Sequence, residues 1–200
     1  YNTENLISLK TWSLGFRNMD AQDELARCLR ALPQVETVGM AMQAPFACGS
    51  NGVHVENEKM SWLNVAGLDS TSFRLLGFRV LEKYSEPLEG TYWFTEEAKR
   101  RYGVSEENRT VGKRDDGTPE YECCGIIADY RSNDALRRPM EDSHNAVQNR
   151  TSICSCIIVK VIGDRKEAFA AVSDVWRSVA VDYLGIPKVA DMSYVDDFLN

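Results

Sequence analysis

The sequence lacks the long apolar run that a membrane-spanning helix requires. A span needs roughly 18 or more consecutive apolar residues, whereas the longest runs here are short, such as residues 153–159. A secretory signal peptide is also missing, because the chain begins at Tyr1 in a polar stretch. Since there is no initiator Met, we interpret the sequence as a piece excised or processed from a longer protein.

Positive charge is in deficit. The chain has 23 Lys and Arg residues against 30 Asp and Glu residues, which gives a net charge of −7. An acidic chain without a basic stripe does not attract nucleic-acid phosphates, so we expect no nucleic-acid partner. Charged residues make up 26% and hydrophobic residues 44%, and this balance excludes disorder and favours a folded globular chain.

The patterns that carry catalysis or cofactor binding are missing. Neither glycine-rich nucleotide-binding motif is present. The two histidines, His54 and His144, have no ligand-like neighbours, and we interpret them as exposed loop residues rather than zinc ligands. Residues 48–52 only superficially resemble a nucleophile elbow, because they do not satisfy G-x-S-x-G. We therefore expect no enzyme activity, no catalytic residue, no metal and no cofactor.

Cysteine is too sparse for a disulfide scaffold, with six in 200 residues. Cys28 lies on the apolar face of a predicted helix, which indicates a buried free thiol. The pairs Cys123/Cys124 and Cys154/Cys156 lie in two apolar, strand-like runs. A bridge between the runs requires that the strands pair, and a four-thiolate metal site is disfavoured because neither pair has CxxC spacing.

Each end of the chain predicts a β-α-β unit. At the start, a strand over 5–14 precedes a helix with Asp20 as N-cap and apolar residues at helical spacing from 21 to 32, and a strand over 35–42 follows. At the end, a doubly buried strand over 153–162 precedes a helix that begins near Asp164 and stops before Gly185. A last strand is predicted over 188–195.

The middle of the chain predicts a different, mixed module. Two short helices are expected at 70–76, capped by Asp69, and at 96–102, capped by Thr95 and closed by Gly103. Residues 105–120 form a charged segment and 130–152 a long polar connection, and both are predicted to be loops. Short strands are predicted at 52–56, 61–66, 79–82, 91–94 and 121–128. The layout as a whole predicts an α+β fold, a split βαβ sandwich with two helices on one face of a mixed sheet and a smaller inserted α+β module.

Several stretches, in order, resemble the extracytoplasmic core domain of MacB/FtsX-like ABC transporter permeases, especially those of Bacteroidetes. The stretches are LRALPQVETVGMAMQAPF (29–46), GSNGVHVE (49–56), LNVAGLDSTSFRLLGFRVLE (63–82), YWFTEEAKRRYG (92–103), ECCGIIADYRSNDAL (122–136) and the terminal YVDDFLN. The chain departs from the family pattern at Trp93–Thr95, at 105–120 and at Cys123–Cys124.

This resemblance implies a porter-like subdomain from residues 1–45 and 121–200 and an inserted Sabre-like subdomain from residues 46–120. It also implies a position between the first and second transmembrane helices of a permease, on the periplasmic side of the inner membrane. The implied partners are the flanking transmembrane helices, a separate or fused cytoplasmic ATPase, and a periplasmic adaptor or lipoprotein. The full-length permease would be a dimer, and this domain would have no catalytic role.

The resulting hypothesis is a module that transmits ATP-driven conformational change to a periplasmic partner or cargo, in export or lipoprotein release. Loops carry recognition, so segments 46–62 and 105–120 are the candidate contacts, with Phe46, Asn51, His54, Trp62, Arg109 and Lys113 as the residues. An alternative is a receptor that binds a peptide, lipid or small molecule in a cleft between the subdomains. A third, thiol or hydrolase chemistry at Cys48 or Ser50, would need His54 or His144 as its base.

Overall fold

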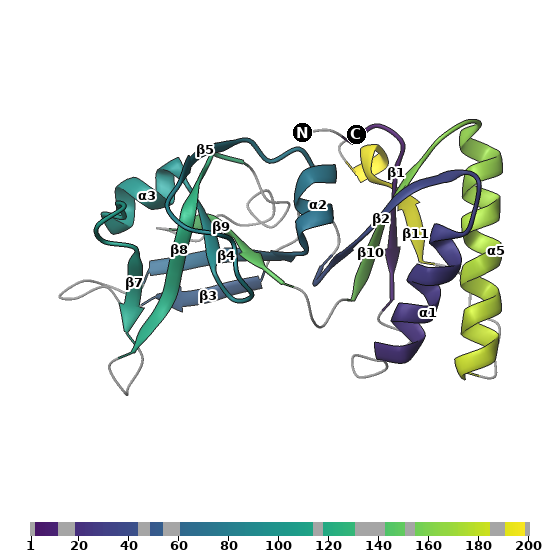
Figure 1. The fold of residues 1–200 in the computed structure, drawn as a ribbon, viewed down its shortest axis with the longest axis horizontal. Coiled ribbons are helices and arrows are strands. Elements are labelled where there is room, and N and C mark those ends of the chain that lie inside the picture. The colour runs from purple at the N-terminus through teal and green to yellow at the C-terminus, as the bar shows by residue number, and fades with distance from the viewer. Residues whose placement is uncertain are drawn as a thin grey trace. The chain divides into compact units, whose positions relative to one another are not determined.

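The chain was described from a computed structural model, which covers residues 3–11, 19–43, 49–53, 61–113, 118–130, 143–150, 155–184 and 191–198. It divides into two compact units: Tyr1–Pro45 with Asp69–Gly77 and Thr151–Asn200, and Phe46–Leu68 with Phe78–Arg150. Both units combine helices with a sheet, so the predicted α+β class is confirmed (Figure 1). Over the described ranges, no helix has both the length and the apolar character to cross a membrane.

The first unit contains an antiparallel four-stranded sheet. Its strands are β1 (Leu6–Lys10), β2 (Val35–Ala41), β10 (Cys156–Val161) and β11 (Met192–Tyr194), in the order β11-β1-β10-β2. Because β10 lies between β1 and β2, and β1 lies between β10 and β11, the two β-α-β units are split and interleaved. The sequence predicted all four strands.

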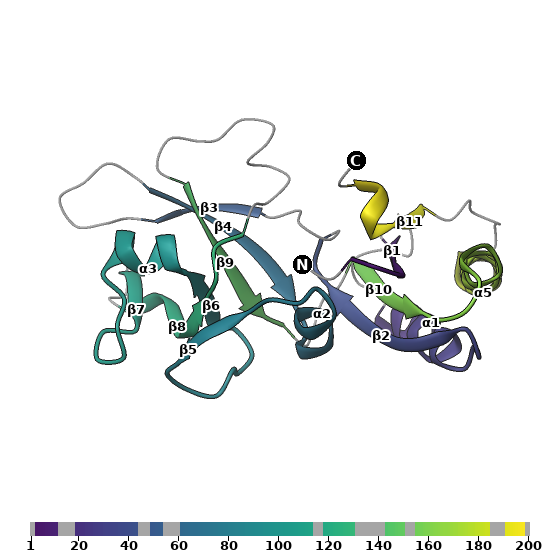
Figure 2. The ribbon, with the colours of Figure 1, turned by 90° about the horizontal axis from the view of Figure 1, so that it is seen from above.

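Two long helices cover one face of this sheet, as predicted. Helix α1 (Met19–Arg30) and helix α5 (Arg165–Leu184) lie side by side (Figures 1 and 2). One hydrophobic core joins them to the strands, with Leu25, Ile157 and Trp176 fully buried in it. Each such side chain contributes about 1.5–3 kcal/mol. Because α1 begins at Met19, Asp20 lies in its first turn rather than at the predicted N-cap, where its charge still suits the helix dipole.

Helix α2 (Ser70–Leu75) belongs to the first unit although its sequence falls within the expected insertion, 46–120. Asp69 caps it as predicted, by accepting from the Ser72 N–H at 2.6 Å. The Ser72 hydroxyl donates to the Met40 carbonyl at 3.0 Å and so fastens α2 to β2. A Cβ on Gly39 would lie 2.7 Å from the Ser72 nitrogen, so only glycine permits this approach.

The second unit contains a mixed sheet. Its strands are β3 (Gly49–Val53), β4 (Ser61–Leu68), β5 (Val80–Lys83), β6 (Tyr92–Thr95), β7 (Thr110–Lys113), β8 (Pro119–Ile127) and β9 (Ser143–Asn149). They lie in the order β3-β4-β9-β6-β8-β5, and β7 also pairs with β8. The β4–β9 and β6–β8 pairs are parallel. Helix α3 (Glu96–Tyr102) follows β6, with Thr95 and the left-handed Gly103 as the predicted caps.

Two strands lie where loops were predicted. β7 falls in the charged segment 105–120, and β9 falls in the polar connection 130–152. β9 is polar in sequence but central in the sheet, because its side chains find internal partners: the Asn145 amide donates to the Tyr130 carbonyl at 2.6 Å. His144 lies on β9 and is buried, so its interpretation as an exposed loop residue was wrong.

The unit boundary also differs from the expected one. Residues 121–150 were expected to join the first subdomain, but β8 and β9 pair only with strands of the second unit among the described residues. For the same reason β8 and β10 do not pair, so the arrangement that a bridge between their cysteines requires is not formed. Cys28, Cys123, Cys124 and Cys156 are free thiols, and Cys48 and Cys154 lie outside the described residues.

Candidate partner-binding surfaces

The first predicted contact segment, residues 46–62, is described in part. Phe46 and His54 lie outside the described residues. Asn51 lies on β3, where its backbone pairs with Leu63 of β4. Trp62 lies on β4 opposite Gly52 and is partly buried. The structure therefore places Asn51 and Trp62 on paired, neighbouring strands.

The second predicted segment, residues 105–120, contains β7 rather than a loop throughout. Arg109 precedes β7 and is partly buried, and its carbonyl accepts from the Cys123 N–H at 2.7 Å. Lys113 ends β7, pairs with Pro119 and is exposed. This pairing to β8 fixes the backbone that carries both cations.

The two segments meet inside the second unit. A Cβ on Gly112 of β7 would lie 3.6 Å from Cγ1 of Val53, the last residue of β3. Val53 and Val111 are both buried in the same hydrophobic cluster. Elements separated by more than a quarter of the chain thus present their ends to one region, which we name the β3–β7 surface, defined by Gly49–Val53, Trp62 and Arg109–Lys113.

An ionic cluster fastens the edge strand of this unit. Lys99 of α3 donates to the Glu82 carboxylate on β5, and the Tyr84 hydroxyl donates to the other Glu82 oxygen at 2.6 Å. The hydrogen bond from Lys99 lowers the pKa of Glu82, whereas burial is the main cause that raises the pKa of Tyr84 to about 12. The cluster ties β5 to α3, which is a structural role.

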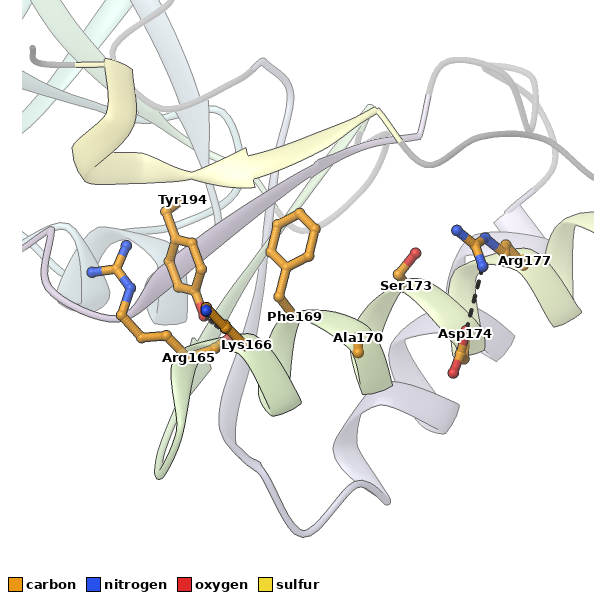
Figure 3. A pocket seen from close by; sticks show the side chains of 8 residues that line it. All are labelled: Arg165, Lys166, Phe169, Ala170, Ser173, Asp174, Arg177 and Tyr194. Carbon is orange, nitrogen blue, oxygen red and sulfur yellow. Dashed lines mark hydrogen bonds and ion pairs between the residues drawn. The ribbon is translucent and has the colours of Figure 1, made fainter.

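A groove that the sequence analysis did not identify lies in the first unit, between α5 and β11 (Figure 3). We name it the α5–β11 groove. Its volume is about 670 Å³. Its lining combines two aromatic rings, three cations, one carboxylate and two small side chains: Phe169, Tyr194, Arg165, Lys166, Arg177, Asp174, Ala170 and Ser173.

One end of the groove is held in place by Arg165. Its guanidinium donates to both Asp196 oxygens, at 2.8 and 3.0 Å, and lies 3.7 Å from the centre of the Tyr194 ring. The Tyr194 hydroxyl donates back to the Arg165 carbonyl at 2.6 Å. The bond to Asp196 raises the pKa of Arg165 and lowers that of Asp196, so both groups are charged at neutral pH. A two-point ion pair stacked on a ring makes a rigid wall.

The floor of the groove is apolar and its rim is cationic. The Phe169 and Tyr194 rings have their centres 5.7 Å apart and are tilted by 31°. Lys166 is exposed on the rim (Figure 3). Arg177 contacts Asp174 at 3.6 Å, an exposed i,i+3 pair that contributes little to stability. Such a surface suits a group that is apolar in the middle and negatively charged at its sides.

A signal for this groove was present in the sequence. Arg165 and Lys166 occupy the first turn of α5, where the helix dipole disfavours positive charge. Two cations at that place indicate a role outside the helix itself. Their partner across the groove, Tyr194, lies 29 residues beyond Arg165 in the sequence, and local patterns carry no information on that pairing.

Comparison with known proteins shows what the fold resembles. No protein-family model matches the chain, and no curated protein matches it. Solved structures do match it, and three of them serve as examples. The periplasmic region of MacB from Actinobacillus actinomycetemcomitans matches with a TM-score of 0.62 and 14% identity, over 98% of this chain and 92% of that one.

Two further solved structures agree with the first. The extracellular domain of the noncanonic ABC-type transporter YknZ from Gram-positive bacteria has a TM-score of 0.59 and 12% identity, over 94% of this chain and 100% of that one. A domain of a permease protein from Porphyromonas gingivalis has a TM-score of 0.58 and 12% identity, over 97% of this chain and 92% of that one. The chain therefore has the fold of the extracytoplasmic domains of MacB-like ABC transporter permeases, and the resemblance predicted from the sequence is confirmed at the level of fold.

Proposed function

We propose that the chain is the extracytoplasmic domain of an ABC transporter permease and relays ATP-driven motion to a partner outside the cytoplasm. The observation that carries this proposal is the fold match over almost the whole of both chains. For the periplasmic region of MacB, the match covers 98% of this chain and 92% of the MacB chain. A match that covers both units in one chain supports the entire architecture rather than one common motif. In this proposal the first unit is the porter-like subdomain and the second is the Sabre-like subdomain.

The register of the first unit supports a position between two membrane spans. Near its beginning β1 pairs Ile7 with Tyr194, the last residue of β11. Directly opposite residues of an antiparallel pair have Cα atoms roughly 5 Å apart. The first described strand thus starts where the last one ends, and the 3₁₀ turn Val195–Phe198 packs beside β1. Two neighbouring transmembrane helices could enter and leave the unit at this edge.

The β3–β7 surface is our proposed contact for an extracytoplasmic adaptor, lipoprotein or cargo. Trp62 supplies a partly exposed aromatic side chain, and Lys113 supplies an exposed cation. The backbone on which they lie is held in a sheet, so the contact would move with the unit as a rigid body. Phe46, Asn51, His54 and Arg109 remain in this proposal. The flanking helices, a cytoplasmic ATPase and a second permease copy would complete the transporter, with the domain on the periplasmic side of the inner membrane.

The test uses the full-length permease with its ATPase in cells. The variant reverses charge at Arg109 and Lys113 (Arg109→Glu with Lys113→Glu), and the matched control reverses it at Arg30 and Arg74, two exposed positions of the first unit. We expect the variant to lose export while membrane level and basal ATP hydrolysis stay unchanged, and the control to export normally. Normal export by the variant would contradict the proposed contact. Alkaline phosphatase needs disulfides that form only outside the reducing cytoplasm, so an inactive fusion of this enzyme after Lys113 would contradict the proposed location.

A further inference from the structure

We propose that the α5–β11 groove binds an extended acidic segment of a partner protein, in which carboxylates flank an apolar side chain. This deepens the proposed function by assigning a second contact, in the first unit, and the chemistry of what it recognises. The segment would lie along the free edge of β11, place its apolar side chain against Phe169 and Tyr194, and bring its carboxylates to Lys166 and Arg177.

The edge of β11 offers backbone groups to such a segment. Among the described strands β11 pairs only with β1. The Lys10 N–H donates to the Asp191 carbonyl at 2.9 Å, and hydrogen-bonded and non-bonded residues alternate along an antiparallel pair. The backbone N–H and C=O of Met192 therefore point away from β1. An added strand can bond to them, the arrangement of peptides that extend a sheet at its edge.

The floor of the groove fits one apolar side chain. Tyr194 is 7% exposed and already belongs to the core, whereas Phe169 packs against that core and is only partly buried. Arg165 is held by Asp196 and stacked on Tyr194, so this wall needs no ordering when a segment binds. Preorganisation of this kind reduces the entropic cost of binding.

The charges on the rim favour discrete carboxylates. Lys166 has no ion-pair partner among the described residues, and Arg177 has only the long contact to Asp174. Exposed carboxylates also lie near, at Asp164, Glu167, Asp174 and Asp197. They repel a continuous anionic surface such as a lipid bilayer, but a segment with spaced carboxylates can avoid them.

The binding experiment uses the 200-residue chain and defined probes. The first probe is a labelled seven-residue peptide with Phe at its centre, Glu two residues before and two residues after it, and Ser elsewhere, because alternate residues of an extended segment share one face. The second has Lys in place of Glu, and the third has Ser in place of Phe. Fluorescence anisotropy gives the affinity of each, and flotation with vesicles of anionic phospholipid tests the membrane as the alternative occupant.

Two variants test the groove, each with a matched control. Lys166→Glu with Arg177→Glu removes the rim cations, and Arg30→Glu with Arg74→Glu changes the net charge equally at other exposed positions of the same unit. Ala170→Trp fills the groove from an exposed position without removing a core side chain. Ser178→Trp adds the same ring to the same helix at an exposed position outside the lining.

The expected result is that the first peptide binds and the other two bind at least tenfold more weakly. Two charge reversals should weaken binding roughly tenfold or more, Ala170→Trp should abolish it, and both controls should bind normally. Equal binding of the Lys peptide, no binding of the first peptide, or unchanged binding by both groove variants would overturn the proposal. Vesicle binding that the rim variant abolishes, without peptide binding, would overturn it in favour of a membrane contact.

Failure of the peptide-binding proposal can be distinguished from failure of the proposed function. The binding experiment contains no membrane and no ATPase, so its failure would leave the place of the chain in a permease untouched. A cytoplasmic location in the fusion experiment would instead refute the permease proposal without altering a measured peptide affinity.

Discussion

Replacement of Gly125 by alanine tests how closely β5, β6 and β8 are packed in the second unit. A Cβ at this position would meet the backbone carbonyl oxygen of Glu82, nearer than real Cβ atoms approach, and would lie 2.6 Å from Cζ3 of Trp93. Neither obstacle is a flexible side-chain end. Trp93 is 5% exposed, and its indole N–H donates to Asn149 at 3.0 Å, so a moving ring would lose a buried hydrogen bond.

The expected cost lies at the upper end of the range for overpacked cores, about 3 kcal/mol. For a chain of this size each kcal/mol lowers Tm by about 2–4 °C, so the melting transition of the chain should fall by roughly 6–12 °C. Scanning calorimetry measures the transition, and hydrogen exchange at Val80–Lys83 should show that β5 loses protection. Gly90→Ala is the control, because its φ of 85° imposes backbone strain while nothing lies within 4 Å of its Cβ; that strain costs about 1–2 kcal/mol. A Gly125→Ala melting point within about 2 °C of wild type, or above that of Gly90→Ala, would refute the packing described here.

Three further predictions concern other parts of the chain. A double-mutant cycle of Arg165→Gln and Asp196→Asn, measured by chemical denaturation, should give a coupling free energy of about 1 kcal/mol at pH 7. Because the ion pair lowers the pKa of Asp196 from 3.8, this coupling should be present above pH 4 and disappear as the pH falls further. A coupling free energy that does not change with pH would contradict the prediction. Burial raises the pKa of Cys123 to about 11 and of Cys156 to about 12, so neither thiol should react with iodoacetamide at pH 8 until the chain unfolds. Rapid labelling of the folded chain, detected by mass spectrometry, would contradict this prediction. Asp69→Ala should cost about 1 kcal/mol through loss of the α2 N-cap, measured by thermal unfolding, whereas Asp69→Ser should recover most of it, and equal stability of the alanine and serine variants would argue against the capping role.

The sequence could predict the features that depend on neighbouring residues. The caps Asp69, Thr95 and Gly103 were predicted because side-chain chemistry and left-handed backbone at helix ends are local properties. Helix α5 was predicted because apolar residues recur at helical spacing through Trp176. These signals located α2, α3 and α5.

The features that sequence reasoning missed depend on long-range pairing. β9 carries polar residues, and only its place between β4 and β6 supplies the partners that make it a central strand. The unit boundaries moved for the same reason, because strand pairing decides to which sheet residues 121–150 belong. The α5–β11 groove was missed because Arg165 meets Tyr194 and Asp196 across about 30 residues, a contact that no periodicity reveals.

The most direct test of the central claim is to read the coding sequence on both sides of the 200 residues in the native gene. The permease proposal predicts an apolar segment of roughly 20 residues shortly before Tyr1 and another shortly after Asn200, with further spans beyond. A coding sequence in which a cleavable signal peptide directly precedes Tyr1 and a stop codon follows soon after Asn200 would contradict the permease proposal. The motion of a permease could not reach a free, secreted protein through flanking helices.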